Sequence, residues 1–189
     1  TQTSSNQTPL DLNTFTRTGY VFDFWSTNPT NGATYDDGDN YPFSQSHSDL
    51  YARWKAGEYT LTYHYDGATS GNTKVSDKFT TGDAGITLPA PSKTGYTFAG
   101  WYSDEALTNS ISSPYSISAN GDAYAKWTIH THTVTYNGNG NTGGSAPTDT
   151  SSPYNFGSTV TVLGNSESLV KTGYSFNGWN TAVSGGTSQ

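Results

Sequence analysis

One short pattern occurs three times in the chain, and this internal repetition constrains the fold more than any other feature. The pattern is Lys/Arg-Thr-Gly-Tyr-x-Phe-x-x-Trp, and it occupies residues 17–25, 93–101 and 171–179. Its tryptophans, Trp25, Trp101 and Trp179, recur at a nearly constant interval. A chain with such a period is expected to fold as similar units placed in tandem.

Two further motifs repeat with a matching interval. Tyr-Ala-Arg/Lys-Trp occupies residues 51–54 and 124–127, and Thr-Leu/Val-Thr-Tyr occupies residues 60–63 and 133–136, so both pairs share one spacing. Only residues 58–128 contain all three motifs. The motifs therefore predict three modules: a partial one that lacks the first strand, a complete one, and a partial one that lacks the last strand, at 1–56, 58–128 and 131–189.

Each motif has the pattern of a β-strand. Tyr59, Leu61 and Tyr63 alternate with polar residues, which is typical of a strand with one buried face. The Thr-Gly pair before each Tyr-x-Phe segment predicts a turn whose glycine has a positive φ. Gly100 predicts a bulge or close approach before Trp101, and Phe24 replaces this glycine in the first unit. The expected fold is mainly β, with little helix.

Composition excludes several classes of protein. The 189 residues carry eight Lys+Arg against 15 Asp+Glu, a net charge of −7 that argues against nucleic-acid or anionic-lipid partners. No apolar run is long enough to span a membrane. The absence of cysteine excludes disulfides, thiolate zinc sites and thiol catalysis. Aromatic residues reach 14%, which argues for a folded chain.

The combined motifs resemble the internalin B-repeat family, also called the Listeria–Bacteroides repeat. The resemblance rests on the three motifs above, on Thr-Tyr-Asn-Gly-Asn-Gly at 135–140 and on Val-Thr-Val-Leu-Gly at 160–164. It implies small β-grasp-like modules, strung in tandem as an extended array in secreted or cell-surface proteins of microbes. It implies no catalytic residues and no cofactor.

Aromatic residues that recur at one register of the repeat are interpreted as module core, because fixed packing positions must recur in every unit. They are Tyr20, Phe22, Trp25, Trp54, Tyr63, Tyr96, Phe98, Trp101, Tyr124, Trp127, Tyr136, Tyr174, Phe176 and Trp179. Tyrosines that do not recur are the candidates for exposed ligand contacts, namely Tyr41, Tyr65, Tyr102 and Tyr115. Asn6 begins the N-glycosylation triplet Asn6-Gln-Thr8.

Two groups of residues are weak candidates for metal binding. His130 and His132 would face the same way on a strand, but no third ligand is evident nearby and a solvated linker is favoured. Asp36, Asp37 and Asp39 offer oxygen ligands, yet they match no calcium-loop register and do not recur in the second unit, so an acidic turn is favoured.

No enzyme signature is present. Gly138–Gly143 matches Gly-x-Gly-x-x-Gly, but Gly-Ser-Ala-Pro follows it, and a dinucleotide site needs a helix there. A turn is the better interpretation of this segment.

The sequence predicts a non-catalytic structural array, a stalk or spacer of an extracellular or surface-attached adhesin or fibre. Its first partners would be neighbouring modules, joined by short linkers at 55–58 and 128–131. The alternative is a module that binds glycans or host proteins. The incomplete end modules are interpreted as boundaries within a longer array; the alternative is completion between chains in a head-to-tail fibre.

Overall fold

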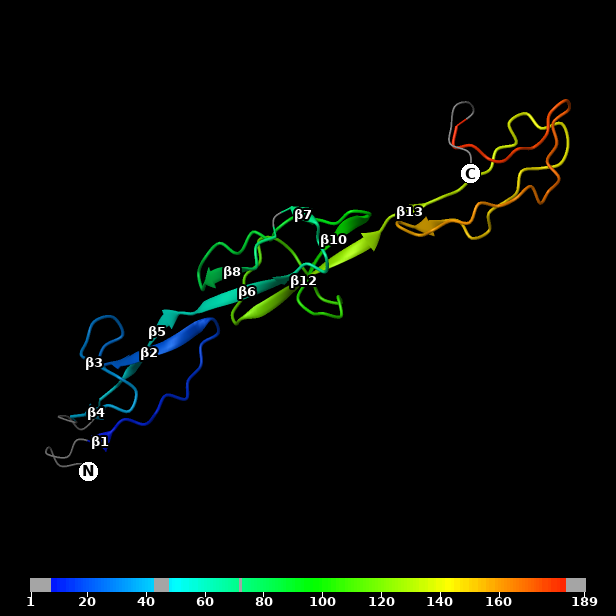
Figure 1. Cartoon of the computed structure of the whole chain (residues 1–189). Helices are drawn as coiled ribbons and strands as arrows, with labels where there is room; N and C mark the ends of the chain where they lie inside the picture. The colour runs from blue at the N-terminus through cyan, green and yellow to red at the C-terminus, as the bar shows by residue number, and fades with distance from the viewer. Residues whose placement is uncertain (1–7, 43–47, 72, 183–189) are drawn as a thin grey trace. The chain divides into compact units, whose positions relative to one another are not determined.

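The structure is a computed structural model that describes residues 8–42, 48–71 and 73–182. Within these residues the chain forms strands, turns and loops and contains no helix (Figure 1). The mainly β fold is therefore confirmed. In chain order the strands are β1 (Thr8–Pro9), β2 (Tyr20–Ser26), β3 (Thr34–Tyr35), β4 (Asn40–Tyr41), β5 (Tyr51–Ala56), β6 (Glu58–His64), β7 (Ser70–Gly71), β8 (Ser76–Thr80), β9 (Pro91–Ser92), β10 (Tyr96–Tyr102), β11 (Ser110–Ile111), β12 (Gly121–Ile129), β13 (Thr131–His132) and β14 (Tyr154–Asn155).

The middle of the chain forms a five-stranded sheet in the order β11-β10-β12-β6-β8. β6 and β12 run parallel at its centre, with Leu61 opposite Gly121 and Tyr63 opposite Ala123. β8 pairs with β6 in the antiparallel sense. Parallel neighbours need a long crossover connection, and residues 65–120, which include β10, provide it.

The core of this sheet follows the alternation predicted for the first strand. Leu61 and Ala123 are fully buried, and Tyr63 is 6% exposed. Trp101 enters the same core at 3% exposure, with its ring centroid 5.2 Å from that of Tyr63. Its indole Nε1 donates a hydrogen bond of 2.8 Å to the carbonyl of Pro89, which satisfies the one polar group of a buried ring.

The first module repeats part of this arrangement in a three-stranded sheet of order β3-β2-β5. Trp25 of β2 lies opposite Tyr35 of β3, as Trp101 of β10 lies opposite Ile111 of β11. The pairing of β2 with β5 changes register between Phe22 and Phe24. The first module therefore has an irregularity just before Phe24, the residue that replaces the glycine of the other units.

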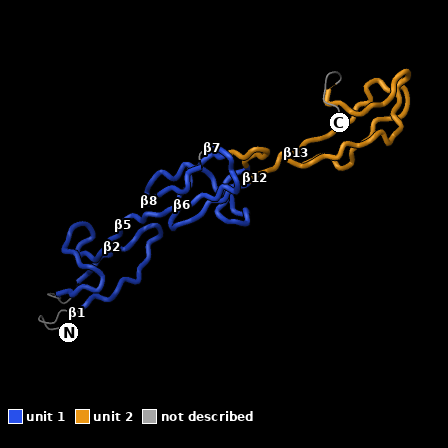
Figure 2. Tube along the Cα trace, viewed as in Figure 1, with its two compact units in different colours: residues 1–91, 99–126 blue, residues 92–98, 127–189 orange. Residues whose placement is uncertain are grey.

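Contacts divide the chain into two compact units (Figure 2). Residues 1–91 and 99–126 form unit 1, and residues 92–98 and 127–189 form unit 2. The division falls inside β10 and β12, so it does not follow the motif boundaries. The three modules remain a prediction from the motifs.

The third module departs from the expected strands. β13 covers only the start of the strand expected at 132–136, and residues 171–179 form one isolated bridge, between Lys171 and Tyr174, rather than a strand. In the other modules the corresponding segment pairs with a closing strand, β5 or β12, and the described part of the third module has no such partner. An extended segment without a partner leaves its backbone hydrogen bonds unmade.

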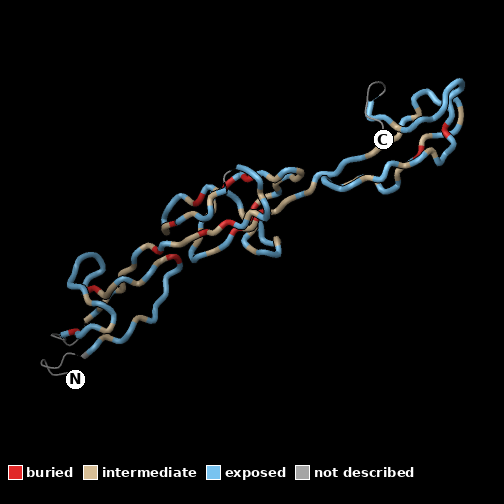
Figure 3. Tube along the Cα trace, in the orientation of Figure 1, coloured by how far each residue is buried: buried red, intermediate tan, exposed pale blue. Residues whose placement is uncertain are grey.

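The burial of residues in the third module is consistent with the missing strand partner. Within residues 131–182, only Pro147 and Leu169 are buried (Figure 3). Tyr174 and Phe176 were expected in the core and are 74% and 43% exposed, so the prediction was wrong for these two residues. In the first two modules a tryptophan of the closing strand, Trp54 or Trp127, packs against the counterpart of Phe176.

Candidate functional site

The Lys/Arg-Thr-Gly-Tyr segment forms the same turn in all three modules. Gly19, Gly95 and Gly173 have φ values of 80°, 79° and 79°. In each turn the amide of the tyrosine donates to the carbonyl of the basic residue, at 2.9 to 3.0 Å. A positive φ at the third residue and this hydrogen bond are the marks of a type II turn. The predicted glycine conformation is confirmed.

The basic residue of each turn lies over the ring of the tyrosine that ends it. The cation is 3.9 Å from the ring centroid for Arg17 and Tyr20, and 4.5 Å for Lys93 and Tyr96. The third pair, Lys171 with Tyr174, is separated by 5.2 Å. This cation–π contact explains why a cation occupies the first position of all three motifs.

The first two modules meet at this turn. The amide of Gly57, in the linker between β5 and β6, donates to the carbonyl of Gly19 at 2.9 Å. The carbonyl of Gly57 accepts from the amide of Thr81, the residue after β8, at 3.0 Å. The Thr81 hydroxyl also donates to the Gly19 carbonyl. The linker residue is thus hydrogen-bonded to both modules.

Unit 2 contains the same arrangement at the next linker. The amide of His130 donates to the carbonyl of Gly95 at 2.8 Å, and its carbonyl accepts from the amide of Phe156 at 2.8 Å. His130 follows Gly57 at the same interval that separates the paired motifs. Two linkers of unlike sequence therefore make the same pair of backbone hydrogen bonds. We call these pairs the module junctions.

Both junctions also place a side chain of the following module against the turn glycine. A Cβ added to Gly19 would lie 3.0 Å from Oγ1 of Thr81, and one added to Gly95 would overlap Cδ1 of the Phe156 ring. At Gly173, the counterpart in the third module, no atom of the described residues lies within 4 Å of such a Cβ. In the first two modules, glycine is required at this position for two reasons: its positive φ and the close approach of a side chain from the following module.

The other recurring aromatic residues pack around the motif strands. Phe22 and Trp54 of the first module, and Phe98 and Trp127 of the next, have ring centroids 5.8 and 5.3 Å apart. Trp179 repeats the anchoring of Trp101, because its Nε1 donates to the carbonyl of Leu163 at 2.8 Å. The half-buried members of the predicted core are Tyr20, Phe22, Trp25, Trp54, Tyr96, Phe98, Tyr124, Trp127, Tyr136 and Trp179.

The four tyrosines expected to contact ligands do not form an exposed set. Tyr41 is 8% exposed and packs edge-on against Tyr35, so its ring is not open to a ligand. Tyr65 donates to the carbonyl of Lys74 and packs against Trp101. Tyr102 lies beneath the Lys126 ammonium, and Tyr115 pairs with Ile86 through backbone hydrogen bonds; both are half-buried. Asn6 lies outside the described residues.

The candidate metal ligands have local hydrogen-bond partners. Asp37 accepts from the Asn13 amide and from Trp25 Nε1, and Asp39 accepts from the Asp36 amide. His130 Nε2 lies 2.9 Å from the Thr97 hydroxyl. The His132 ring centroid is 6.3 Å from that of Phe156. Across the described ranges, no group of three or more His, Cys, Asp or Glu side chains is placed to hold a metal ion.

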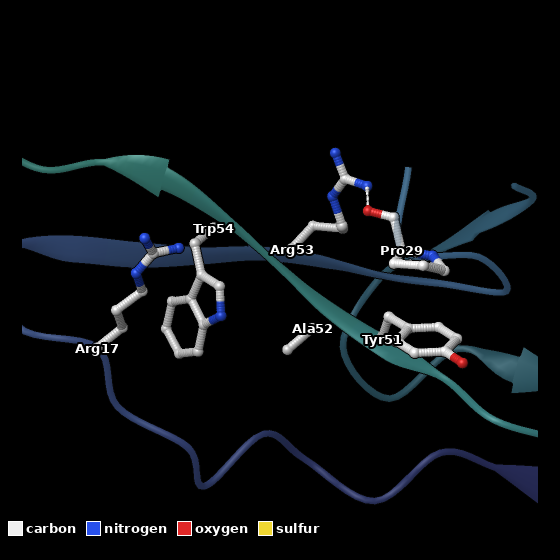
Figure 4. Close-up of a pocket in the computed structure, with 6 residues that line it drawn as sticks. All are labelled: Arg17, Pro29, Tyr51, Ala52, Arg53 and Trp54. Atoms are coloured by element: carbon white, nitrogen blue, oxygen red, sulfur yellow. Dashed lines mark hydrogen bonds between the residues drawn. The ribbon is translucent and has the colours of Figure 1, made fainter. Parts of the chain in front are cut away.

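Sequence reasoning missed an open cavity of about 380 Å³ in the first module (Figure 4). Its lining comes from the turn before β2, from the loop after β2 and from β5. The lining residues are Arg17, Pro29, Tyr51, Ala52, Arg53 and Trp54. Arg17 and Arg53 are the only arginines in the sequence. The signal that could have revealed the site is that both stand where the next module has lysines, Lys93 and Lys126.

The described residues contain no helix that is long and apolar enough to cross a membrane. Two similar proteins come from Evansella cellulosilytica. One, named "Putative Gly-rich membrane protein", is 34% identical over 89% of this chain, and the other, named "Putative membrane protein", is 38% identical over 74%. The chain spans 18% and 20% of their lengths. No solved structure matches it.

The repeat family predicted from the motifs also matches the chain directly. The Listeria-Bacteroides repeat domain matches three times, at residues 1–53, 59–126 and 132–189. These matches cover nearly the whole sequence, and the junctions at Gly57 and His130 fall in the gaps between them. The chain therefore belongs to the Listeria-Bacteroides repeat domain family.

Proposed function

We propose that this chain is a non-catalytic structural segment, a semi-rigid spacer within a larger secreted or surface-attached protein. The observation that carries the proposal is the recurrence of one junction at both linkers. Gly57 and His130 differ in side chain, yet each makes the same two backbone hydrogen bonds, one to the preceding module and one to the following module. A linker with both of its backbone groups bonded resists bending more than a solvated one.

The turn glycines support the same role. The side chain that packs against Gly19 or Gly95 comes from the following module. The Lys/Arg-Thr-Gly-Tyr turn therefore both starts a strand of its own module and contacts the next module. The names of the two relatives support a location at a membrane or cell surface. We infer that the segment carries other domains away from that surface, and that an adhesin or fibre is the kind of protein that uses it.

Spin labels placed across the first junction test the spacer role. The chain has no cysteine, so Asn31→Cys with Ser112→Cys gives two unique sites, both exposed and both in unit 1. We expect one narrow distance distribution by pulsed electron spin resonance. A Gly-Ser-Gly-Ser insertion after Gly57 is the control and should broaden it. A distribution as broad in the parent as in the insertion variant would refute the semi-rigid spacer.

A further inference from the structure

The cavity of the first module brings together both arginines of an otherwise acidic chain. Eight Lys+Arg stand against 15 Asp+Glu in the sequence, and the only two arginines both line one cavity of about 380 Å³ (Figure 4). The arginines come from different segments, Arg17 from the turn before β2 and Arg53 from β5. The fold, rather than sequence proximity, brings them to one site.

Each guanidinium has a contact that holds it, and that contact leaves some of its N–H donors unused. Arg53 Nη1 donates to the carbonyls of Pro29 and Thr30 at 2.5 and 3.3 Å, which anchors one side of its fork. Arg17 lies over the Tyr20 ring. No acidic side chain of the described residues forms an ion pair with either arginine. Unpaired guanidinium donors that are already positioned suit a planar anion, because arginine can bind a carboxylate through two parallel hydrogen bonds.

The second module provides an internal comparison. Its counterparts of Arg17 and Arg53 are Lys93 and Lys126, whose ammonium groups lie 4.5 Å from the Tyr96 ring and 4.7 Å from the Tyr102 ring. Charge is therefore the same at these positions in both modules, but the forked donor occurs only in the first. The turn and the closing strand of the second module form with lysine at these two positions, so packing alone does not explain the arginines of the first.

Aromatic rings complete the lining. Tyr51 is 39% exposed, and the half-buried Trp54 also lines the cavity. An exposed and a half-buried ring beside charge-bearing donors offer an apolar surface next to a polar anchor, a combination that suits a sugar ring carrying an acidic group. We propose that the Arg17–Arg53 cavity binds the carboxylate of an acidic saccharide, with the sugar ring against Tyr51 and Trp54.

The proposal is independent of the spacer role, because the junction residues take no part in the cavity. The net charge of −7 repels polyanions in general, so the interaction depends on the local fork rather than on a long-range field. Binding should therefore require a carboxylate on the sugar and should not extend to any anion of similar charge.

Titration of the whole chain with trigalacturonate, followed by nuclear magnetic resonance, tests the site. We expect shifts centred on Arg17, Arg53 and Trp54, and none with the methyl ester of the same saccharide, which lacks the charge. Inorganic phosphate is the third probe. Absence of trigalacturonate binding, or equal binding of its ester, would overturn the proposal. Saturable phosphate binding with the same affinity would overturn the saccharide assignment.

The repeat supplies matched variants. Arg17→Lys with Arg53→Lys keeps the charge and installs the residues that the second module already accommodates, so the fold should persist. We expect an affinity loss of about tenfold or more, because the fork is removed. Lys93→Arg with Lys126→Arg, the reciprocal change in the second module, should leave the trigalacturonate affinity of the first-module site unchanged. Equal affinity of the parent and the double lysine variant would refute the role of the guanidinium groups.

Discussion

The ring of Phe156 lies directly against the backbone of Gly95, where an added Cβ would overlap Cδ1 of the ring. Backbone hydrogen bonds join the same two segments through His130, which bonds to Gly95 on one side and to Phe156 on the other. This side-chain contact distinguishes the second junction from the third module, where no atom in the described part of the chain lies within 4 Å of a Cβ added to the turn glycine.

Alanine substitutions at the turn glycines distinguish the cost of backbone strain from the loss of the side-chain contact at the junction. Gly95 and Gly173 share a φ of 79°, so alanine costs each the same strain, about 1–2 kcal/mol. Gly95→Ala must in addition displace the Phe156 ring. We expect Gly95→Ala to accelerate amide exchange at Phe156 and Gly173→Ala to leave it unchanged. Equal effects of the two variants would show that the ring contact does not hold the junction.

Trp101 is expected to dominate the stability of the complete module. Trp101→Ala removes a side chain that is 3% exposed and should lower the free energy of unfolding by about 3–5 kcal/mol. The control is Tyr174→Ala, since Tyr174 is 74% exposed and should change stability by no more than about 0.5 kcal/mol. Urea unfolding followed by circular dichroism measures both variants. Similar costs for the two would contradict the core assignment.

Alkaline pH should destabilise the complete module through Tyr63. Burial, followed by the hydrogen bond that its hydroxyl donates to Asp77 at 2.6 Å, raises the pKa of Tyr63 well above its usual value. A group with a raised folded-state pKa contributes stability that is present below the unfolded pKa, about 10, and is lost progressively as pH rises from there through the folded pKa.

The unfolding free energy should therefore begin to fall at about pH 10 and continue to fall as pH rises further. Tyr63→Phe should flatten this decline, although burial, followed by the charge of Asp77, also raises the pKa of Tyr65 and leaves a residual slope. Urea titrations at a series of pH values measure both proteins. A decline of the same steepness in Tyr63→Phe would exclude Tyr63 as its source.

Acid should loosen the loop that follows β10. The Asp104 carboxylate accepts from the amides of Thr108 and Asn109, and these hydrogen bonds hold its pKa below the usual value. Such a group stabilises the loop above its unfolded pKa and loses that effect as pH falls through the folded pKa. We expect the Thr108 amide to exchange faster in Asp104→Asn than in the parent at neutral pH. Unchanged exchange would assign the loop geometry to other contacts.

The fold was predictable from sequence wherever one module contains its own partners. The alternation at Tyr59–Tyr63 and the turn before Tyr96 depend on local pattern, and both occur as expected. The exposure of Tyr174 could not be read from the motif, because its burial depends on a closing strand that the motif does not contain. The arginine cavity was missed for a related reason, since three separate segments line it.

The junction pairs were also invisible in the sequence. The side chains of Gly57 and His130 have no chemistry in common. They need none, because the junction hydrogen bonds use only backbone groups. Only their equivalent positions in the repeat connect them. Backbone recognition of this kind leaves little trace in residue identity.

Amide hydrogen exchange of the whole chain at Gly57, Thr81, His130 and Phe156 tests the central claim, that linkers of unlike sequence are fixed by the same backbone hydrogen bonds. These four amides are the donors of both junctions. We expect protection of all four, comparable to that of the Tyr63 amide within the complete module. Exchange of Gly57 and His130 at the rates of an unstructured peptide would contradict it.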